Sequence, residues 1–205
     1  WALRRGQPHV HRAHAEMLPG ALAATLSRFV ADRYDGQLVV QFLAAGVERW
    51  REALVDGLVA ATGCTQVYER SDAAVREREG LESRVGPMRG DAPSAPVEIV
   101  EDGVRYGVDV LHGHKTGFYL DERESRKRVA ELAAQIGPSA TILNCFSYTG
   151  GFSLAAMKAG AARAISVDSS ADALAAAAQN AARNRIDPAA FECRVRKGGD
   201  AQRAL

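Results

Sequence analysis

Residues 144–152 read Asn-Cys-Phe-Ser-Tyr-Thr-Gly-Gly-Phe and directly follow the apolar run Ala-Thr-Ile-Leu at 140–143. An apolar run, a turn of small residues and a helix are typical of a strand end that places backbone N–H groups against a nucleotide. The next expected strand, 164–167, is followed by Asp168. A carboxylate about 20 residues beyond such a turn can accept both hydroxyls of a ribose. The stretch therefore predicts a site for an adenosine-containing cofactor.

Strands and helices alternate through the second half of the chain. We expect strands at 140–145, 163–167 and 191–195 and helices at 123–136, 151–159 and 171–184. In the first helix the apolar positions expected to point inward are Val129, Leu132, Ala133 and Ile136. Such alternation predicts a parallel sheet covered by helices on both faces, with ligands at the carboxyl ends of the strands. Asp200, which follows the third strand, belongs to that edge.

The first half of the chain follows another pattern. A short amphipathic helix is expected at 21–30, a strand at 38–43, a helix at 48–62 ended by Gly63, a second strand at 66–70 and a long loop at 80–96. Alternating apolar residues on both sides of Asp102-Gly103 predict a hairpin. We therefore expect a small α+β domain at 32–110 and a second domain at 111–205, and leave 1–31 unassigned.

The composition is that of an ordinary globular protein. Apolar residues make up 47% of the chain, charged residues 25%, and the net charge is +1. The charge gives no overall field that would attract nucleic acid, so RNA contacts would have to come from local basic clusters such as 123–128 and 194–197. Three separated cysteines indicate neither a disulfide framework nor a zinc site, and without a long apolar run we expect a cytoplasmic protein with no membrane or metal partner.

The site residues have plainer interpretations when each is taken alone. The turn lacks the Gly-x-Gly-x-x-Gly dinucleotide fingerprint and could be a tight connection that needs glycine. Asp168 could be the N-cap of the helix that starts near Ser170, and Asp200 is as ambiguous. The three features together are more specific than any one of them, because a glycine turn, an acid for the ribose and an acid for the adenine amino group follow three successive strands.

Longer motifs carry a resemblance to a known family. The sequence resembles the bacterial 23S ribosomal RNA cytosine-5 methyltransferases over roughly residues 32–200, and the match includes Asn180 and Asn184. The matching segments are 113–123 (Gly-His-Lys-Thr-Gly-Phe-Tyr-Leu-Asp-Glu-Arg), 144–152, 166–170 (Ser-Val-Asp-Ser-Ser), 32–34, 39–43 and 68–72 (Tyr-Glu-Arg-Ser-Asp). The resemblance implies an α/β fold, with a partial Rossmann-like class I methyltransferase domain preceded by a small α+β domain.

The resemblance also implies roles for the site. S-adenosylmethionine would be the cofactor and ribosomal RNA the partner. The cofactor-binding residues would be Phe146, Ser147, Tyr148, Thr149, Gly150, Gly151, Asp168 and Asp200. Five further residues would lie at the pocket mouth: Lys115, Thr116, Tyr119, Asp121 and Arg123. A plainer interpretation is that Asp121 and Arg123 pair with each other and cap the helix.

No residue of this chain is expected to be catalytic. Carbon 5 of cytosine becomes nucleophilic when a cysteine thiolate adds to carbon 6, and none of Cys64, Cys145 and Cys193 lies in a suitable context. The family's nucleophile would follow position 205. The chain starts with Trp1 and ends in what reads as the first turn of a helix, so we expect an inactive fragment cut at both ends.

Three alternatives stay open at this point. One is a nucleotide-dependent oxidoreductase, which the missing fingerprint disfavours. Another is an S-adenosylmethionine-dependent methyltransferase acting on guanine in ribosomal RNA, since neighbouring families share the cofactor motifs. The third is a non-catalytic RNA-binding module of the same fold.

Overall fold

The computed structural model describes residues 10–14 and 28–196, which fall into two compact units. The first runs to Ile99 and includes Val108–Leu120, and the second combines Val100–Gly107 with the residues from Asp121 onward. The boundary differs from the one expected near residue 110, because most of the 97–108 hairpin belongs to the second unit and the segment after it to the first. Of the helices described, none has both the length and the apolar character needed to cross a membrane.

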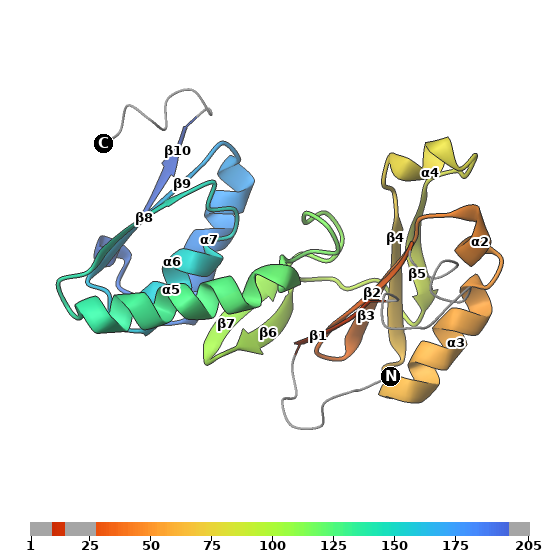
Figure 1. Cartoon of the computed structure of the whole chain (residues 1–205), viewed down its shortest axis with the longest axis horizontal. Coiled ribbons are helices and arrows are strands. Elements are labelled where there is room, and N and C mark those ends of the chain that lie inside the picture. The colour runs from red at the N-terminus through yellow and green to blue at the C-terminus, as the bar shows by residue number, and fades with distance from the viewer. Residues whose placement is uncertain (1–9, 15–27, 197–205) are drawn as a thin grey trace. The chain divides into compact units, whose positions relative to one another are not determined.

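The first unit is built on a five-stranded sheet with the order β1-β2-β3-β4-β5 (Figure 1). The strands are β1 (Val10–His14), β2 (Phe29–Tyr34), β3 (Gln37–Phe42), β4 (Gln66–Ser71) and β5 (Arg84–Arg89). All pairs are antiparallel except β3–β4. A parallel pair needs a crossover, which α2 (Ala45–Glu48) and α3 (Arg51–Thr62) supply. A short helix, α4 (Val75–Arg78), connects β4 to β5.

Helix α3 buries its apolar stripe against the sheet. Val55 and Leu58 pack with side chains of β3 and β4, such as Val40 and Val67, in one cluster. Gly63 ends the helix in the left-handed conformation, with a φ of 70°, as its position in the sequence predicts. The expected helix 48–62 is therefore confirmed, with a break at residues 49–50 between α2 and α3.

Two expectations for the first unit are wrong. The helix expected at 21–30 is wrong at its last positions, because Phe29 and Val30 lie in β2, where the Phe29 ring centroid is 5.1 Å from that of Phe42. Residues 21–27 of that expectation lie outside the described residues. The loop expected at 80–96 contains β5. Pro87 is tolerated there because β5 is the edge strand of the sheet that the described residues form, so no further strand among them needs its missing N–H.

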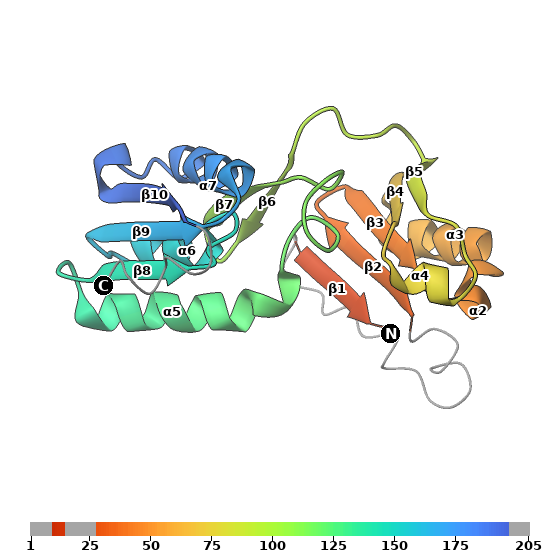
Figure 2. The ribbon, with the colours of Figure 1, turned by 90° about the horizontal axis from the view of Figure 1, so that it is seen from above.

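The second unit contains a three-stranded parallel sheet in the order β10-β9-β8 (Figure 2). The elements are β8 (Thr141–Cys145), β9 (Arg163–Asp168), β10 (Phe191–Val195), α5 (Arg123–Ile136), α6 (Gly151–Lys158) and α7 (Ala171–Arg183), with short 3-10 helices at Leu120–Glu122 and Pro188–Ala190. The predicted alternation of strands and helices and the parallel pairing are confirmed.

The helices of this unit gather on one face of the sheet. Asn144, Ser166 and Cys193 are register partners, so their side chains share a face. Ser153 of α6 bonds to the first two, and the Cys193 thiol lies 3.6 Å from a carbonyl of α7. Successive right-handed crossovers in one direction place both helices on the same side. The expected cover of both faces is therefore absent among the described residues, and Leu143 on the other face is 40% exposed.

The predicted inward face of α5 is only partly right. Ala133 is buried at 1% exposure, and Val129 packs against the same cluster, but Leu132 is 43% exposed and Ile136 62%. Arg126, which the sequence placed in a basic surface cluster, is buried at 3% exposure. Helix α5 therefore contacts α6 through a narrower stripe of apolar side chains than its sequence predicts.

The predicted hairpin is confirmed as β6 (Val97–Glu101) and β7 (Val104–Val108). Its turn residues Asp102 and Gly103 both have positive φ, 49° and 80°. Two successive positive φ angles match the twist of the flanking strands, and Asp-Gly is among the residue pairs that tolerate them best.

Candidate cofactor-binding site

The turn between β8 and α6 has an unusual backbone. Phe146 and Tyr148 adopt left-handed φ angles of 59° and 48°, and Gly150 follows with 80°. Each left-handed non-glycine residue costs about 1–2 kcal/mol. The turn is held by hydrogen bonds from the Ser147 N–H to the Val167 carbonyl, 3.0 Å, and from the Gly150 N–H to the Ser147 carbonyl, 2.9 Å. Strain held in place this way is typical of binding sites.

The glycine pair allows the start of α6 to pack closely. A Cβ on Gly150 would lie 3.0 Å from the Cβ of Ala177, and one on Gly151 would lie 3.0 Å from the Cδ of Arg126. At Gly150 the positive φ adds a second penalty for any other residue. The small residues of the motif therefore serve the packing of α6 against α7 and α5 as well as the turn itself.

Asp168 joins two neighbouring strand ends. Its Oδ2 accepts the Tyr148 N–H at 2.8 Å, and its Oδ1 accepts the Ser170 N–H at 3.0 Å. The N-cap of α7 is Ser170, whose Oγ accepts the Ala173 N–H at 3.1 Å, so the N-cap interpretation of Asp168 is wrong. Each carboxylate oxygen can accept a second hydrogen bond, which leaves Asp168 able to bind two hydroxyls.

Ser147 carries a buried hydroxyl without a hydrogen-bond partner among the described residues. The residue is 5% exposed, and its Oγ is screened from solvent. A buried polar group left unpaired costs about 1–3 kcal/mol. By contrast Phe146, one residue earlier, is 79% exposed. Among the described residues the turn thus holds one polar group without a hydrogen-bond partner and one exposed apolar side chain.

Polar side chains behind the turn fix its position. Asn144 donates to the Ser153 Oγ at 3.0 Å, which lies 2.7 Å from the Ser166 Oγ. Asn180 of α7 donates to the Thr149 carbonyl at 3.4 Å and accepts the Gly107 N–H of β7 at 2.8 Å. Neither Asn144, Ser153 nor Asn180 has a role that its sequence context predicts. Asn180 stood out only because it and Asn184, four positions later, belong to the family resemblance.

The second asparagine of that helix binds the hairpin. Asn184 accepts the Arg105 N–H at 2.9 Å and donates to the Arg105 carbonyl at 2.7 Å. Asn180 and Asn184 therefore attach the end of α7 to β7 through backbone groups of Gly107 and Arg105.

A buried ion pair lies beside Gly151, the first residue of α6. Arg126 donates to both oxygens of Glu101, at 2.6 and 2.9 Å, and both side chains are almost fully buried. The Tyr106 hydroxyl lies 3.4 Å from the Gly151 carbonyl, and burial raises the pKa of Tyr106, which keeps its hydroxyl neutral. These contacts connect α5 and the hairpin to the first residue of α6.

The residues expected at the pocket mouth are divided between the two units. Lys115, Thr116 and Tyr119 belong to the first unit, and Asp121 and Arg123 to the second. Thr116 is 1% exposed and hydrogen-bonds Asp32 at 2.5 Å and Tyr34 at 2.7 Å, so its hydroxyl serves the fold of the first unit.

The other members are more accessible. The Lys115 Nζ lies 4.4 Å from the centre of the Tyr119 ring, a cation–π contact. The Arg123 Nη2 lies 3.7 Å from the Asp102 Oδ1, and Glu122, the N-cap residue of α5, makes no side-chain cap hydrogen bond. Asp200 lies outside the described residues.

All three cysteines lie in the described part of the chain. The three cysteines are free, and Cys64 is buried. The Cys193 thiol lies near the Leu174 carbonyl, and burial, with Glu192 beside it, raises its pKa, the opposite of an activated nucleophile. No cluster of residues able to hold a metal ion occurs among the described residues.

Sequence comparison identifies the family. The profile of S-adenosylmethionine-dependent methyltransferases matches residues 20–192. The chain belongs to this methyltransferase family. Among curated proteins, the ribosomal RNA large subunit methyltransferase I of Aliivibrio fischeri is 45% identical over 175 residues, 85% of this chain and 41% of the relative. The protein of the same name from Vibrio campbellii is 48% identical over 156 residues, 76% of this chain and 38% of the relative. The chain thus spans about two fifths of these methyltransferases.

Solved structures agree on the methyltransferase fold. A Streptococcus mutans protein named as an S-adenosylmethionine-dependent methyltransferase matches with a TM-score of 0.73 and 24% identity, over 87% of this chain and 45% of that one. A methyltransferase complexed with SAH matches at 0.72 and 25%, over 87% and 44%. The tRNA m1G37 methyltransferase of M. jannaschii matches at 0.57 and 16%, over 82% and 46%. The expected α/β class and the family resemblance are confirmed.

Proposed function

We propose that the protein containing this chain transfers a methyl group from S-adenosylmethionine to carbon 5 of a cytosine in large-subunit ribosomal RNA. The observation that carries the proposal is the link between Asp168 and the Tyr148 N–H, 2.8 Å long, which brings a strained turn and a carboxylate from neighbouring strand ends together. In a parallel sheet this edge is where ligands bind. The curated relatives named as ribosomal RNA methyltransferases support the choice of substrate.

The site residues take roles that fit the cofactor's chemistry. Residues Phe146–Gly151 would surround the methionine end and the ribose, with the Ser147 hydroxyl, unpaired among the described residues, available to a polar group of the ligand. Asp168 would bind the ribose hydroxyls, and Asp200 would approach the adenine. S-adenosylmethionine supplies an electrophilic methyl group on a sulfonium, so the protein's task is to hold it in place.

We propose a direct binding role for four of the five pocket-mouth residues. Lys115, Tyr119, Asp121 and Arg123 offer charge and a ring face for RNA or for the cofactor's carboxylate. Thr116 acts indirectly, because its hydroxyl is bonded to Asp32 and Tyr34 and holds the neighbouring segment in place.

The nucleophile is proposed to come from outside these 205 residues. Methylation at carbon 5 needs a thiolate that adds to carbon 6 and a base that later removes the carbon 5 proton. Cys193 is a poor candidate because burial raises its pKa. The segment alone is therefore expected to bind the cofactor weakly and to transfer no methyl group, and a cytoplasmic location with ribosomal RNA as partner follows from the proposed substrate.

The decisive experiment is mass spectrometry of nucleosides from unmodified 23S ribosomal RNA treated with the complete protein and labelled S-adenosylmethionine. Labelled 5-methylcytidine is the expected product. Labelled methylguanosine would instead support the guanine alternative, which the structural match to a tRNA m1G37 methyltransferase keeps in view. Absence of any labelled nucleoside, with intact cofactor binding, would favour the non-catalytic module.

A further inference from the structure

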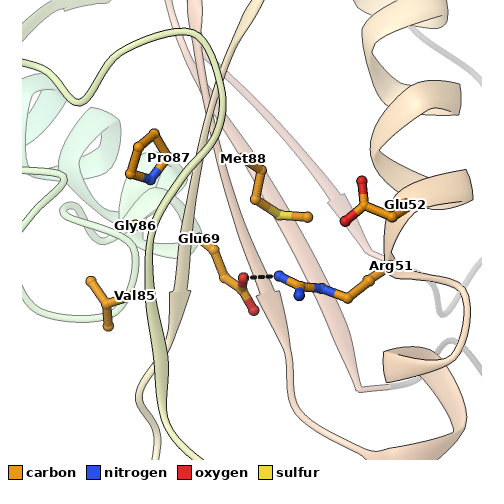
Figure 3. Close-up of a pocket in the computed structure, with 7 residues that line it drawn as sticks. All are labelled: Arg51, Glu52, Glu69, Val85, Gly86, Pro87 and Met88. Atoms are coloured by element: carbon orange, nitrogen blue, oxygen red, sulfur yellow. Dashed lines mark hydrogen bonds and ion pairs between the residues drawn. The ribbon is translucent and has the colours of Figure 1, made fainter.

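Polar side chains that the proposed methyl transfer does not use lie in both units. In the first unit, an ion pair between Arg51 and Glu69 lines a cavity of about 300 Å³ and joins α3 to β4 (Figure 3). In the second unit, Asn180 and Asn184 of α7 are buried at 1% and 8% exposure. The asparagines share this unit with the proposed cofactor turn at 146–151, and α7 contacts that turn directly.

The side-chain amide of Asn180 is held in one orientation. Its Oδ1 accepts the Gly107 N–H of β7 at 2.8 Å and lies 3.3 Å from the Nη1 of Arg183. A backbone N–H and a guanidinium can only donate, so the amide oxygen faces them and the amide nitrogen faces the other way. On that other side, the Asn180 Nδ2 donates to the Thr149 carbonyl at 3.4 Å. The amide therefore presents its N–H groups to the turn.

The peptide group between Thr149 and Gly150 is held at both of its polar atoms. Its carbonyl oxygen accepts from Asn180, and its N–H donates to the Ser147 carbonyl at 2.9 Å. A Cβ on Gly150 would lie 3.0 Å from the Cβ of Ala177, which precedes Asn180 by three positions and so lies on the same face of α7. Helix α7 therefore supports this peptide group by close packing and by a hydrogen bond.

The turn requires support because its backbone is strained. Phe146 and Tyr148, just before this peptide group, have left-handed φ angles of 59° and 48°. Such conformations persist only where surrounding contacts over-determine them. A turn that is ordered before its ligand arrives also binds more tightly, because the cost of ordering it does not reduce the binding free energy. The contact from Asn180 to Thr149 is therefore expected to affect cofactor affinity as well as stability.

We propose that Asn180 is a positioning residue of the cofactor site, which acts through the Thr149 carbonyl, and that Asn184 has no such role. The inference deepens the proposed function and rests on its cofactor site. The Asn184 amide accepts the Arg105 N–H and donates to the carbonyls of Arg105 and Asn180, and among the described residues it bonds to no residue of the turn. The two asparagines thus share their chemistry and differ in their contact with the turn.

Calorimetry with SAH on the complete protein tests this role in the variant Asn180→Asp. The aspartate keeps an acceptor for the Gly107 N–H, and its charge pairs with Arg183, but it has no N–H to donate to Thr149. We expect the Kd for SAH to rise about three- to tenfold, the usual effect of losing one neutral hydrogen bond. Hydrogen exchange at the Gly107 amide should stay as slow as in the wild type, because its acceptor is retained.

Asn184→Asp is the matched control. It removes the same kind of donor from the Arg105 carbonyl, so it should lower the melting temperature and leave the Kd for SAH within about twofold of the wild type. Unchanged SAH affinity in Asn180→Asp overturns the proposal. An equal loss of affinity in Asn184→Asp also overturns it, because affinity would then follow stability and not contact with the turn.

A second variant covers failure of Asn180→Asp to fold. Asn180→Ala also lacks the donor to Thr149, so its Kd for SAH should rise by at least the same factor, and an unchanged Kd overturns the proposal. The wild type separates the two claims. If the wild type binds SAH and the Asn180 variants bind it equally well, the positioning role alone is rejected; if the wild type does not bind SAH, the cofactor assignment is rejected and the positioning role with it.

Discussion

Replacing Ser147 by alanine is expected to stabilise the ligand-free protein and to weaken cofactor binding. The Ser147 hydroxyl is buried at 5% exposure and unpaired among the described residues, so the ligand-free fold carries its desolvation cost of about 1–3 kcal/mol. Alanine removes that cost and loses only the contacts of one oxygen atom. We expect a net gain of about 1 kcal/mol, which raises the melting temperature by about 2–4 °C.

The same change should act in the opposite direction on the complex. If the hydroxyl bonds to the cofactor, its loss removes a neutral hydrogen bond of about 0.5–1.5 kcal/mol, a two- to twelvefold rise in the Kd for SAH. Thermal melts without ligand and calorimetry with SAH measure the two effects. Ser153→Ala is the matched control, because its hydroxyl is fully buried but bonded to Asn144 and Ser166, so this variant should melt lower. A Ser147→Ala protein that melts lower and binds SAH as before would refute the reasoning.

Three further predictions concern the supports of the site. Arg126→Ala leaves Glu101 buried and unpaired and should cost about 3–5 kcal/mol in the free energy of unfolding by urea; near-neutral stability would contradict the buried pair. Asn180→Ala leaves the Gly107 N–H without its partner and should cost about 1–3 kcal/mol, with faster hydrogen exchange at that amide. Because burial raises the pKa of Cys193, its alkylation rate should rise at higher pH in the folded protein than in urea. The Cys193 thiol stays protonated to a higher pH in the folded state than in the unfolded state. Its contribution to the free energy of unfolding is therefore complete below its ordinary pKa and declines as the pH rises above that value. Equal pH midpoints of alkylation in the folded protein and in urea would contradict this.

The parts of the fold that sequence predicted well depend on local patterns. The apolar runs of β8, β9 and β10 and the turn residues Asp102-Gly103 encode their conformation within a few positions. Strand β5 was missed because Pro87 and nearby glycines read as a loop, and only its position at the sheet edge explains why proline is accepted there.

The contacts that fix the site are long-range and were not predictable. Arg126 pairs with Glu101 from 25 positions away, and Asn180 reaches a β7 amide 73 positions away. No spacing rule connects such residues, and a charge run at 123–128 gave no sign that one arginine points inward. Asp168 was selected correctly as a strand-end acid, but its bonds to both flanking loops depend on the sheet register.

Calorimetric titration of the complete protein with SAH and with nicotinamide dinucleotide tests the central claim most directly. We expect saturable SAH binding, no heat from the dinucleotide, and at least a tenfold loss of SAH affinity in Asp168→Ala, because two charge-assisted hydrogen bonds to the ribose disappear. Asp172→Asn, an exposed acid in the first turn of α7, should bind SAH nearly as the wild type does. Dinucleotide binding without SAH binding, or an unchanged SAH affinity in Asp168→Ala, would contradict the claim that the tips of β8 and β9 together hold the cofactor.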